Sequence, residues 1–155
     1  MEYDSDKQSV RIVEKGSLDN KKANKPHGEL LTEIRNELRR YQLLAHRLSE
    51  SGKQELVFVR ERGFSRFAAE TQALYKVIGV ADLTAWENEL MYQEIAPVSV
   101  KKWLTGNAKA KKDAVAAALI EYVGQQSYAC DDESDAVAGG IAWLLSKVYI
   151  KQRLA

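Results

Sequence analysis

The stretch that constrains this chain most is Asp131-Asp132-Glu133-Ser134-Asp135-Ala136-Val137-Ala138, residues 131–138, which begins the last apolar run of the sequence. Acidic residues followed by small and apolar ones are typical of the first turn of a helix that packs against a core. Residues three apart share one face of a helix, so Asp132 and Asp135 point the same way and are able to hold a divalent metal. The alternative is that these acids only cap the helix and complement the positive end of its dipole.

Composition limits the classes of protein to which this sequence can belong. The chain has 155 residues, of which 45% are hydrophobic, and this is enough for one domain with its own core. The 23 Lys and Arg nearly balance the 22 Asp and Glu, so any binding of nucleic acid needs a local basic patch. The single cysteine, Cys130, excludes an internal disulfide and suits a reducing compartment. Without a membrane-spanning run or a signal-peptide pattern, we expect residues 1–155 to form one cytoplasmic domain that does not bind membranes.

Hydrophobic periodicity predicts an α/β protein. The polar residues 4–8 follow the end of one strand and precede a stretch with the β-branched residues Val10, Ile12 and Val13, which indicates a hairpin whose second strand runs from residue 9 to about 18. The continuous apolar run at residues 56–59 indicates a strand over about 54–59 that is covered on both faces in a parallel or mixed sheet. A further strand at 90–95 and helices at about 28–51, 65–86, 98–104, 113–123 and 131–152 complete the pattern. We expect the three tryptophans to anchor the core: Trp86, Trp103 and Trp143.

Glu61 follows the predicted buried strand directly, within Arg60-Glu61-Arg62-Gly63-Phe64. In open α/β sheets, ligands and catalytic groups gather just beyond the carboxyl ends of strands, so Glu61 is a candidate functional carboxylate. The alternative is an ordinary surface carboxylate that pairs with Arg60 or Arg62.

A lysine-rich segment precedes the acidic stretch. Lysines beside a helix end suit phosphate, because they attract the backbone of a nucleic acid and free N–H groups add to that attraction. The alternative is a solvated charged surface. Together with Arg62, the predicted DNA-binding set is Lys101, Lys102, Lys109, Lys111 and Lys112.

These three features occur in the order used by RNase H-like nucleases: a carboxylate after a buried strand, a lysine-rich turn, and acids on the first turn of the last helix. In such enzymes, carboxylates hold a divalent metal that activates water and stabilises the leaving oxygen of a phosphodiester. Oxygen ligands favour Mg²⁺, with Mn²⁺ as a possible substitute.

From about Ser9 onward, the sequence resembles the RuvC-type Holliday junction resolvases, particularly those of bacteriophages and prophages. Residues 59–64 are similar to the strand that carries the second catalytic acid of the family, which is Glu61 in this sequence. Val100-Lys101-Lys102-Trp103-Leu104-Thr105-Gly106-Asn107 is similar to the lysine-containing segment of the family, and residues 132–138 resemble its Asp-x-x-Asp-Ala-x-Ala signature. The resemblance implies an RNase H-like mixed sheet flanked by helices, with Glu61, Asp132 and Asp135 as catalytic metal ligands, and Lys101 and Lys112 as catalytic lysines near the scissile phosphate.

Residues 1–20 depart from the family pattern. The family begins with a central strand that bears its first catalytic aspartate in an Ile-Asp-Pro-Ser or similar turn, and nothing in residues 1–20 matches it. Met1-Glu2-Tyr3 aligns better with the end of the second strand, and residues 9–18 align with the third. We therefore expect the central first strand to be missing, which leaves unpaired strand edges. We also expect a chain truncated at its start, or a decayed copy, with weak or absent cleavage.

The function implied by the resemblance is that of a magnesium-dependent, structure-selective endodeoxyribonuclease. Such an enzyme hydrolyses phosphodiester bonds in branched DNA, including four-way junctions, and acts as a homodimer. Two alternatives stay open. One is a non-catalytic DNA-binding module or prophage remnant on the same fold, and the other is an unrelated α/β protein-interaction domain without salt-dependent affinity for DNA.

Overall fold

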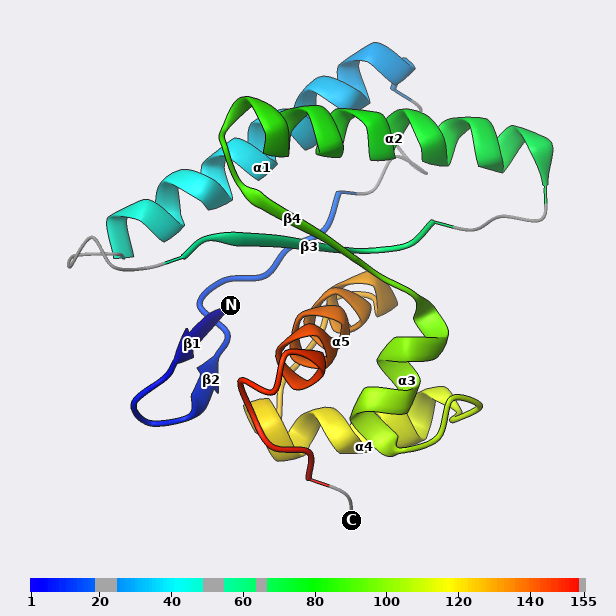
Figure 1. The fold of residues 1–155 in the computed structure, drawn as a ribbon. Helices are drawn as coiled ribbons and strands as arrows, with labels where there is room; N and C mark the ends of the chain where they lie inside the picture. Colours follow the sequence, from blue (N-terminus) through cyan, green and yellow to red (C-terminus); the bar gives the residue numbers. More distant parts are fainter. Residues whose placement is uncertain (19–24, 49–54, 64–66, 154–155) are drawn as a thin grey trace. The chain divides into compact units, whose positions relative to one another are not determined.

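The computed structural model describes residues 1–18, 25–48, 55–63 and 67–153, which alternate between strands and helices (Figure 1). The chain divides into two compact units: a C-terminal unit of residues 1–17, 59–62 and 94–155, and a helical-pair unit of residues 18–58 and 63–93. None of the described helices is long and apolar enough to cross a membrane. In chain order, the elements are β1 (Glu2–Asp4), β2 (Ser9–Arg11), α1 (His27–Leu48), β3 (Val57–Glu61), α2 (Ala68–Glu87), β4 (Met91–Ile95), α3 (Pro97–Thr105), α4 (Lys112–Val123) and α5 (Asp131–Ser146).

The first two strands form the predicted hairpin. β1 and β2 are antiparallel, with Tyr3 opposite Val10. Their turn is closed by the Asp4 carboxylate, whose Oδ1 accepts the backbone N–H groups of Asp6 and Lys7 at 3.0 Å each. The prediction that the second strand extends to about residue 18 is wrong, because β1 offers only three residues for pairing and β2 ends with them at Arg11.

β3 and β4 form a second, separate two-stranded sheet. The rings of Phe58 and Tyr92 lie 5.7 Å apart, and the N–H of Arg62 donates to the carbonyl of Ile95 at 2.8 Å, so the two strands run in the same direction. β3 continues through Glu61, whereas the sequence predicted an end near residue 59. The reason is that pairing with β4 extends to this end of β3. Residue 54, where the prediction began, lies outside the described residues.

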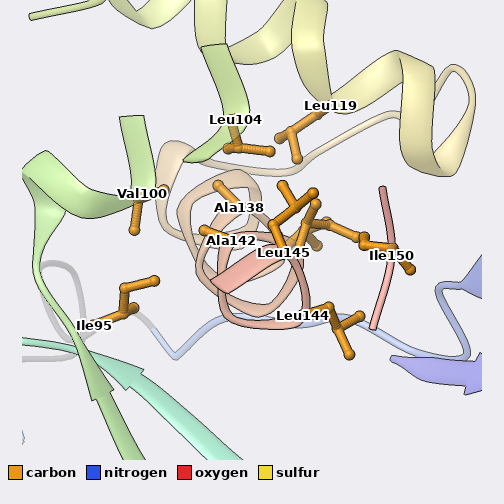
Figure 2. Packing of buried hydrophobic residues seen from close by; sticks show 11 residues of the cluster. Ile95, Val100, Leu104, Leu119, Ala138, Ala142, Leu144, Leu145 and Ile150 are labelled. Atoms are coloured by element: carbon orange, nitrogen blue, oxygen red, sulfur yellow. The ribbon is translucent and has the colours of Figure 1, made fainter. Parts of the chain in front are cut away.

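Helix α5 is the centre of the C-terminal unit. Ile141 of α5 and Leu104 of α3 are completely buried, with 0% of each exposed. Figure 2 shows Leu104, Leu119 of α4 and Ile150 gathered around α5. Burial of each such side chain contributes about 1.5–3 kcal/mol, so this cluster is the main source of stability in the unit.

The ends of α3 and α5 have different causes. α3 ends at Thr105, close to the predicted end at residue 104, because the left-handed backbone of Gly106 (φ 74°) lets its N–H donate to the Lys102 carbonyl at 2.9 Å. α5 stops at Ser146, so the prediction of a helix to about residue 152 is wrong. The chain folds back at this point because Ile150 is buried in the same core, and the Tyr149 carbonyl accepts the Tyr3 hydroxyl at 2.5 Å.

Helices α1 and α2 make up most of the described helical-pair unit. Glu87, the last residue of α2, accepts hydrogen bonds from Arg35 and Arg39 of α1 at 2.7 and 3.1 Å, which ties the two helices together. α2 buries Ala85 but leaves Trp86 82% exposed.

Trp86 is not a core anchor, and that part of the prediction is wrong. Residues one apart on a helix point about 100° away from each other, so the burial of Ala85 turns Trp86 outward. The other two tryptophans, Trp103 and Trp143, pack against the core of the C-terminal unit as predicted.

Replacing Leu104 with alanine should destabilise the protein by about 2–5 kcal/mol, because it leaves a cavity at a fully buried site. Thermal unfolding followed by circular dichroism measures the effect. Val98→Ala is the matched control on the same helix, since Val98 is 59% exposed and should change stability by less than about 0.5 kcal/mol. Equal losses for both variants would contradict the assignment of Leu104 to the core.

Candidate active site

Three of the predicted site residues influence one another electrostatically within the C-terminal unit. Glu61 is the last residue of β3, Lys101 lies on α3, and Asp135 lies on the first turns of α5. Partial burial raises the pKa of the Glu61 carboxyl, repulsion from Asp135 raises it further, and the Lys101 ammonium opposes both effects. Two carboxylates and one cation, contributed by three distant segments of sequence, therefore share one electrostatic environment.

The arginines beside Glu61 are engaged with another carboxylate. Arg60 forms an ion pair with Glu94 of β4, and the Nε of Arg62 lies 3.4 Å from Glu94 Oε2. Successive side chains of a strand point to opposite faces, so Arg60 and Arg62 lie on one face and Glu61 lies on the other. Glu94 thus holds both guanidinium groups on the face opposite Glu61, whose carboxyl is influenced electrostatically by Asp135 and Lys101.

The acids on the first turns of α5 have different surroundings. Glu133 is buried, and its Oε2 accepts the N–H of Ala129 at 2.9 Å, so this carboxylate stabilises the start of the helix. Asp135 behaves differently. Partial burial raises the pKa of the Asp135 carboxyl, and repulsion from Asp131 and Asp132 also raises it. The ammonium groups of Lys112 and Lys101 act in the opposite direction and lower this pKa.

Lys112, the first residue of α4, forms an ion pair with Asp131. Its Nζ lies 2.6 Å from Asp131 Oδ2, and this hydrogen bond raises the pKa of the ammonium and lowers that of the carboxyl. Both side chains are about three-quarters exposed, at 74% and 76%, so the pair adds little stability. The sequence analysis missed Asp131, because nothing in a run of acids shows which of them faces Lys112.

Asp132 is exposed on the first turn of α5, and it acts on Asp135 and Lys112 through its charge. In the described residues, no three or more Asp, Glu, His or Cys side chains are grouped closely enough to hold a metal ion. The three-carboxylate metal site therefore stays a prediction. Glu61 and Asp135 nevertheless fit Mg²⁺ chemically, because this ion is commonly bound by one or two carboxylates together with water and substrate phosphates.

The remaining lysines lie on the same unit. Lys109 and Lys111 line an open hollow of about 520 Å³ between α3 and α4, together with Thr105 and Asn107. The Asn107 side chain shapes this turn, since its Oδ1 accepts the Lys109 N–H at 2.9 Å. Lys102 is exposed on α3, and Arg62 is 67% exposed while it contacts Glu94. A hollow with lysines on its walls has the shape and charge that suit a phosphate backbone.

Comparison with known proteins identifies what this chain is similar to. The family model described as crossover junction endodeoxyribonuclease RuvC matches residues 7–143. No curated protein matches the chain. The solved structure of Thermus thermophilus RuvC is 21% identical with a TM-score of 0.65, and the match covers 81% of this chain and 72% of that one. The structure titled T. thermophilus RuvC in complex with Holliday junction substrate gives 21% identity and a TM-score of 0.66, with 80% and 72% covered. This likeness confirms the predicted RNase H-like α/β fold.

Glu61→Gln should raise the melting temperature at neutral pH, by a few degrees at most. A carboxyl whose pKa is raised in the folded state binds its proton more tightly there than in the unfolded chain, so stability falls as pH rises from the ordinary value of 4.5 through the raised one. Glutamine removes this loss. Melting temperatures from pH 4 to pH 8, without divalent metal, should show a difference that grows with pH. Glu121→Gln is the control, because Glu121 is an exposed residue of α4. If Glu61→Gln is less stable than the parent at pH 7, the attraction between Glu61 and Lys101 dominates.

Proposed function

The chain belongs to the RuvC family of crossover junction endodeoxyribonucleases, and we propose that it binds four-way DNA junctions and hydrolyses phosphodiester bonds in them. The observation that carries this proposal is the electrostatic coupling of Glu61 to Asp135 and Lys101, because these residues come from three segments that all lie inside the matched range 7–143. Nucleases of this family depend on a divalent metal, and we propose Mg²⁺, with Mn²⁺ as a substitute.

Glu61 and Asp135 are the proposed carboxylate ligands, with Asp132 as the third. The pKa values of both carboxyls are raised, mainly by partial desolvation, with repulsion from Asp135 acting on Glu61 and repulsion from Asp131 and Asp132 acting on Asp135. These raised values support the assignment, because a bound cation would relieve the repulsion. When bound, such an ion activates water and stabilises the leaving oxygen of the phosphodiester.

The two catalytic lysines have different surroundings and therefore different proposed roles. Lys101 is half-buried and acts on both Glu61 and Asp135, so its position beside the carboxylates is maintained by the fold. In the proposed complex it neutralises charge on the scissile phosphate. Lys112 is exposed on the rim of the site, where its ammonium exchanges Asp131 for a phosphate oxygen of the DNA. Such exchange costs little, because an exposed ion pair contributes at most about 1 kcal/mol.

The DNA backbone would continue over the basic surface of the same unit. Lys102, Lys109, Lys111 and Arg62 are exposed there, and such groups bind phosphates without reading base sequence. A homodimer would present two copies of the site to one junction.

A second function is favoured by one observation. In the described part of the chain, no group of three potential ligands is arranged around a common point. A non-catalytic protein that binds branched DNA through its basic surface would need no such group. The two functions differ in one measurable result, which is cleavage.

Lys101→Ala should lower the rate of junction cleavage about 10- to 100-fold, and Glu61→Gln should abolish it, while both variants still bind the junction. The assay uses labelled four-way and linear DNA with Mg²⁺ or Mn²⁺, and binding is measured by gel shift in the presence of Ca²⁺. Glu121→Gln is again the control. If the parent protein binds the four-way junction but leaves it intact with either metal, the non-catalytic function is correct. If it binds neither DNA, both functions are wrong.

Divalent metal should stabilise the parent protein more than the double variant Glu61→Gln and Asp135→Asn. A ligand that binds only the folded state at 100 times its Kd adds about 2.7 kcal/mol, so Mn²⁺ titration followed by melting temperature reports binding without any assay of activity. Equal shifts for parent and double variant would contradict the assignment of these two carboxylates as ligands.

A further inference from the structure

Helix α5 begins without a side-chain cap at its N-cap position. That residue is Cys130, and its side chain makes no hydrogen bond to the first turn. Ser, Thr, Asn and Asp are preferred at an N-cap because their side chains accept the N–H groups that a helix start leaves without partners. Asp131 is the first residue of α5, and Asp135 follows one turn later. The position of these carboxylates therefore depends on what holds the loop before the helix.

The loop before α5 is held by Lys15, which follows β2 and lies 112 residues before Ser127 in the sequence. The Lys15 ammonium donates a hydrogen bond to the Ser127 carbonyl. Its Nζ also lies 4.4 Å from the centroid of the Tyr128 ring, which is within the range of a cation–π interaction. Lys15 is half-buried, and it belongs to the same C-terminal unit as the loop. Two directed contacts thus fix residues 127 and 128.

Tyr128 connects Lys15 to the core of the unit. Its ring packs against the buried hydrophobic cluster around α5. Within the described residues, the buried Tyr128 hydroxyl has no hydrogen-bond partner. Burial raises the pKa of this hydroxyl, and the Glu133 carboxylate raises it further. The contacts that hold Tyr128 are therefore those of its ring.

The next residues connect this loop to the helix. Ala129 directly follows Tyr128, and its N–H donates to Glu133 Oε2 at 2.9 Å. Glu133 is buried on the first turn of α5, two residues before Asp135. A continuous set of contacts therefore links the Lys15 ammonium to the first turns of α5.

The chemistry of Lys15 suits a role in alignment. An apolar side chain at this position would only fill space, whereas a charge-assisted hydrogen bond and a cation–π contact specify where Ser127 and Tyr128 lie. We infer that Lys15 is a positioning residue, which fixes the loop at residues 127–129 and thereby aligns the Asp132 and Asp135 carboxylates to share a metal ion with Glu61. This inference rests on the metal site of the proposed function, and it concerns a residue outside that site.

Amide hydrogen exchange tests the first step, from Lys15 to the helix. Lys15→Met keeps an unbranched side chain and removes the charge, so the loop loses both contacts. The amides of Ala129 and of residues 135–137 should then exchange about tenfold faster. Lys15→Arg should restore slow exchange, since a guanidinium also donates to carbonyls and stacks on aromatic rings. Lys7→Met is the matched control on the same N-terminal segment, because the Lys7 side chain is 79% exposed.

Two variants of Tyr128 separate the role of its ring from that of its hydroxyl. Tyr128→Phe keeps the ring and removes a hydroxyl without a partner in the described part of the chain, so exchange should match the parent. Tyr128→Leu removes the ring and should accelerate exchange of the same amides as Lys15→Met does. Equal exchange in the Phe and Leu variants would overturn the role of the ring.

The affinity for Mn²⁺ tests the second step, from the helix to the metal ligands, and needs no cleavage. Isothermal titration calorimetry of the folded protein measures it. Lys15→Met should raise the Kd for Mn²⁺ roughly three- to tenfold, which is less than the effect of groups bonded directly to a ligand. Lys15→Arg and Lys7→Met should bind Mn²⁺ as the parent does. A lysine with a purely structural role would lower the melting temperature and leave this Kd unchanged.

The possible failures of this proposal are distinguishable from failure of the proposed function. Unchanged exchange in Lys15→Met, or faster exchange with an unchanged Kd for Mn²⁺, would overturn the positioning role alone. If the parent protein itself binds no Mn²⁺, the proposed metal site is wrong and the positioning role is overturned with it.

Discussion

The burial of α5 against α3 is the constraint on which the candidate site depends. Leu104 is fully buried and Ala138 nearly so, and each lies three residues after a charged residue of the site, Lys101 on α3 and Asp135 on α5. Side chains three apart on a helix lie on the same side, so packing of the apolar pair fixes where the charged pair points. The core of the C-terminal unit thus sets the geometry of the charges at its edge.

The electrostatics of the site oppose the stability of the fold. Glu61 and Asp135 are exposed as whole residues, yet partial desolvation and neighbouring carboxylates raise the pKa of both carboxyls, and Lys101 compensates only in part. A protein under selection for stability alone would place a neutral or paired group at one of these positions. The Arg60 and Glu94 pair shows that this chain does pair charges nearby, whereas no ion pair within the described residues includes the Glu61 or Asp135 carboxylate, and the cation of the proposed function would supply the missing charge.

Local patterns singled out Glu61 at a strand end and Asp135 on a helix turn, and the resemblance to a family added Lys101; the structure shows these three residues coupled electrostatically. The sequence did not predict features that depend on contacts between residues far apart in the chain. The end of α5 depends on the burial of Ile150, and the length of β2 depends on the three residues that β1 offers for pairing. The pairing of Lys112 with Asp131 depends on how α4 and α5 are turned relative to each other, which no local pattern records.

The position of Trp86 is another feature that local sequence patterns do not predict. Sequence assigns a tryptophan in a helix to a core, yet the phase of α2 is set by its smaller residues, Ala81 and Ala85, which are buried. The exposed face that results belongs to residues 63–93, whereas Glu61, Lys101 and Asp135 belong to the other unit. Changes on α2 therefore leave the chemical groups of the site untouched.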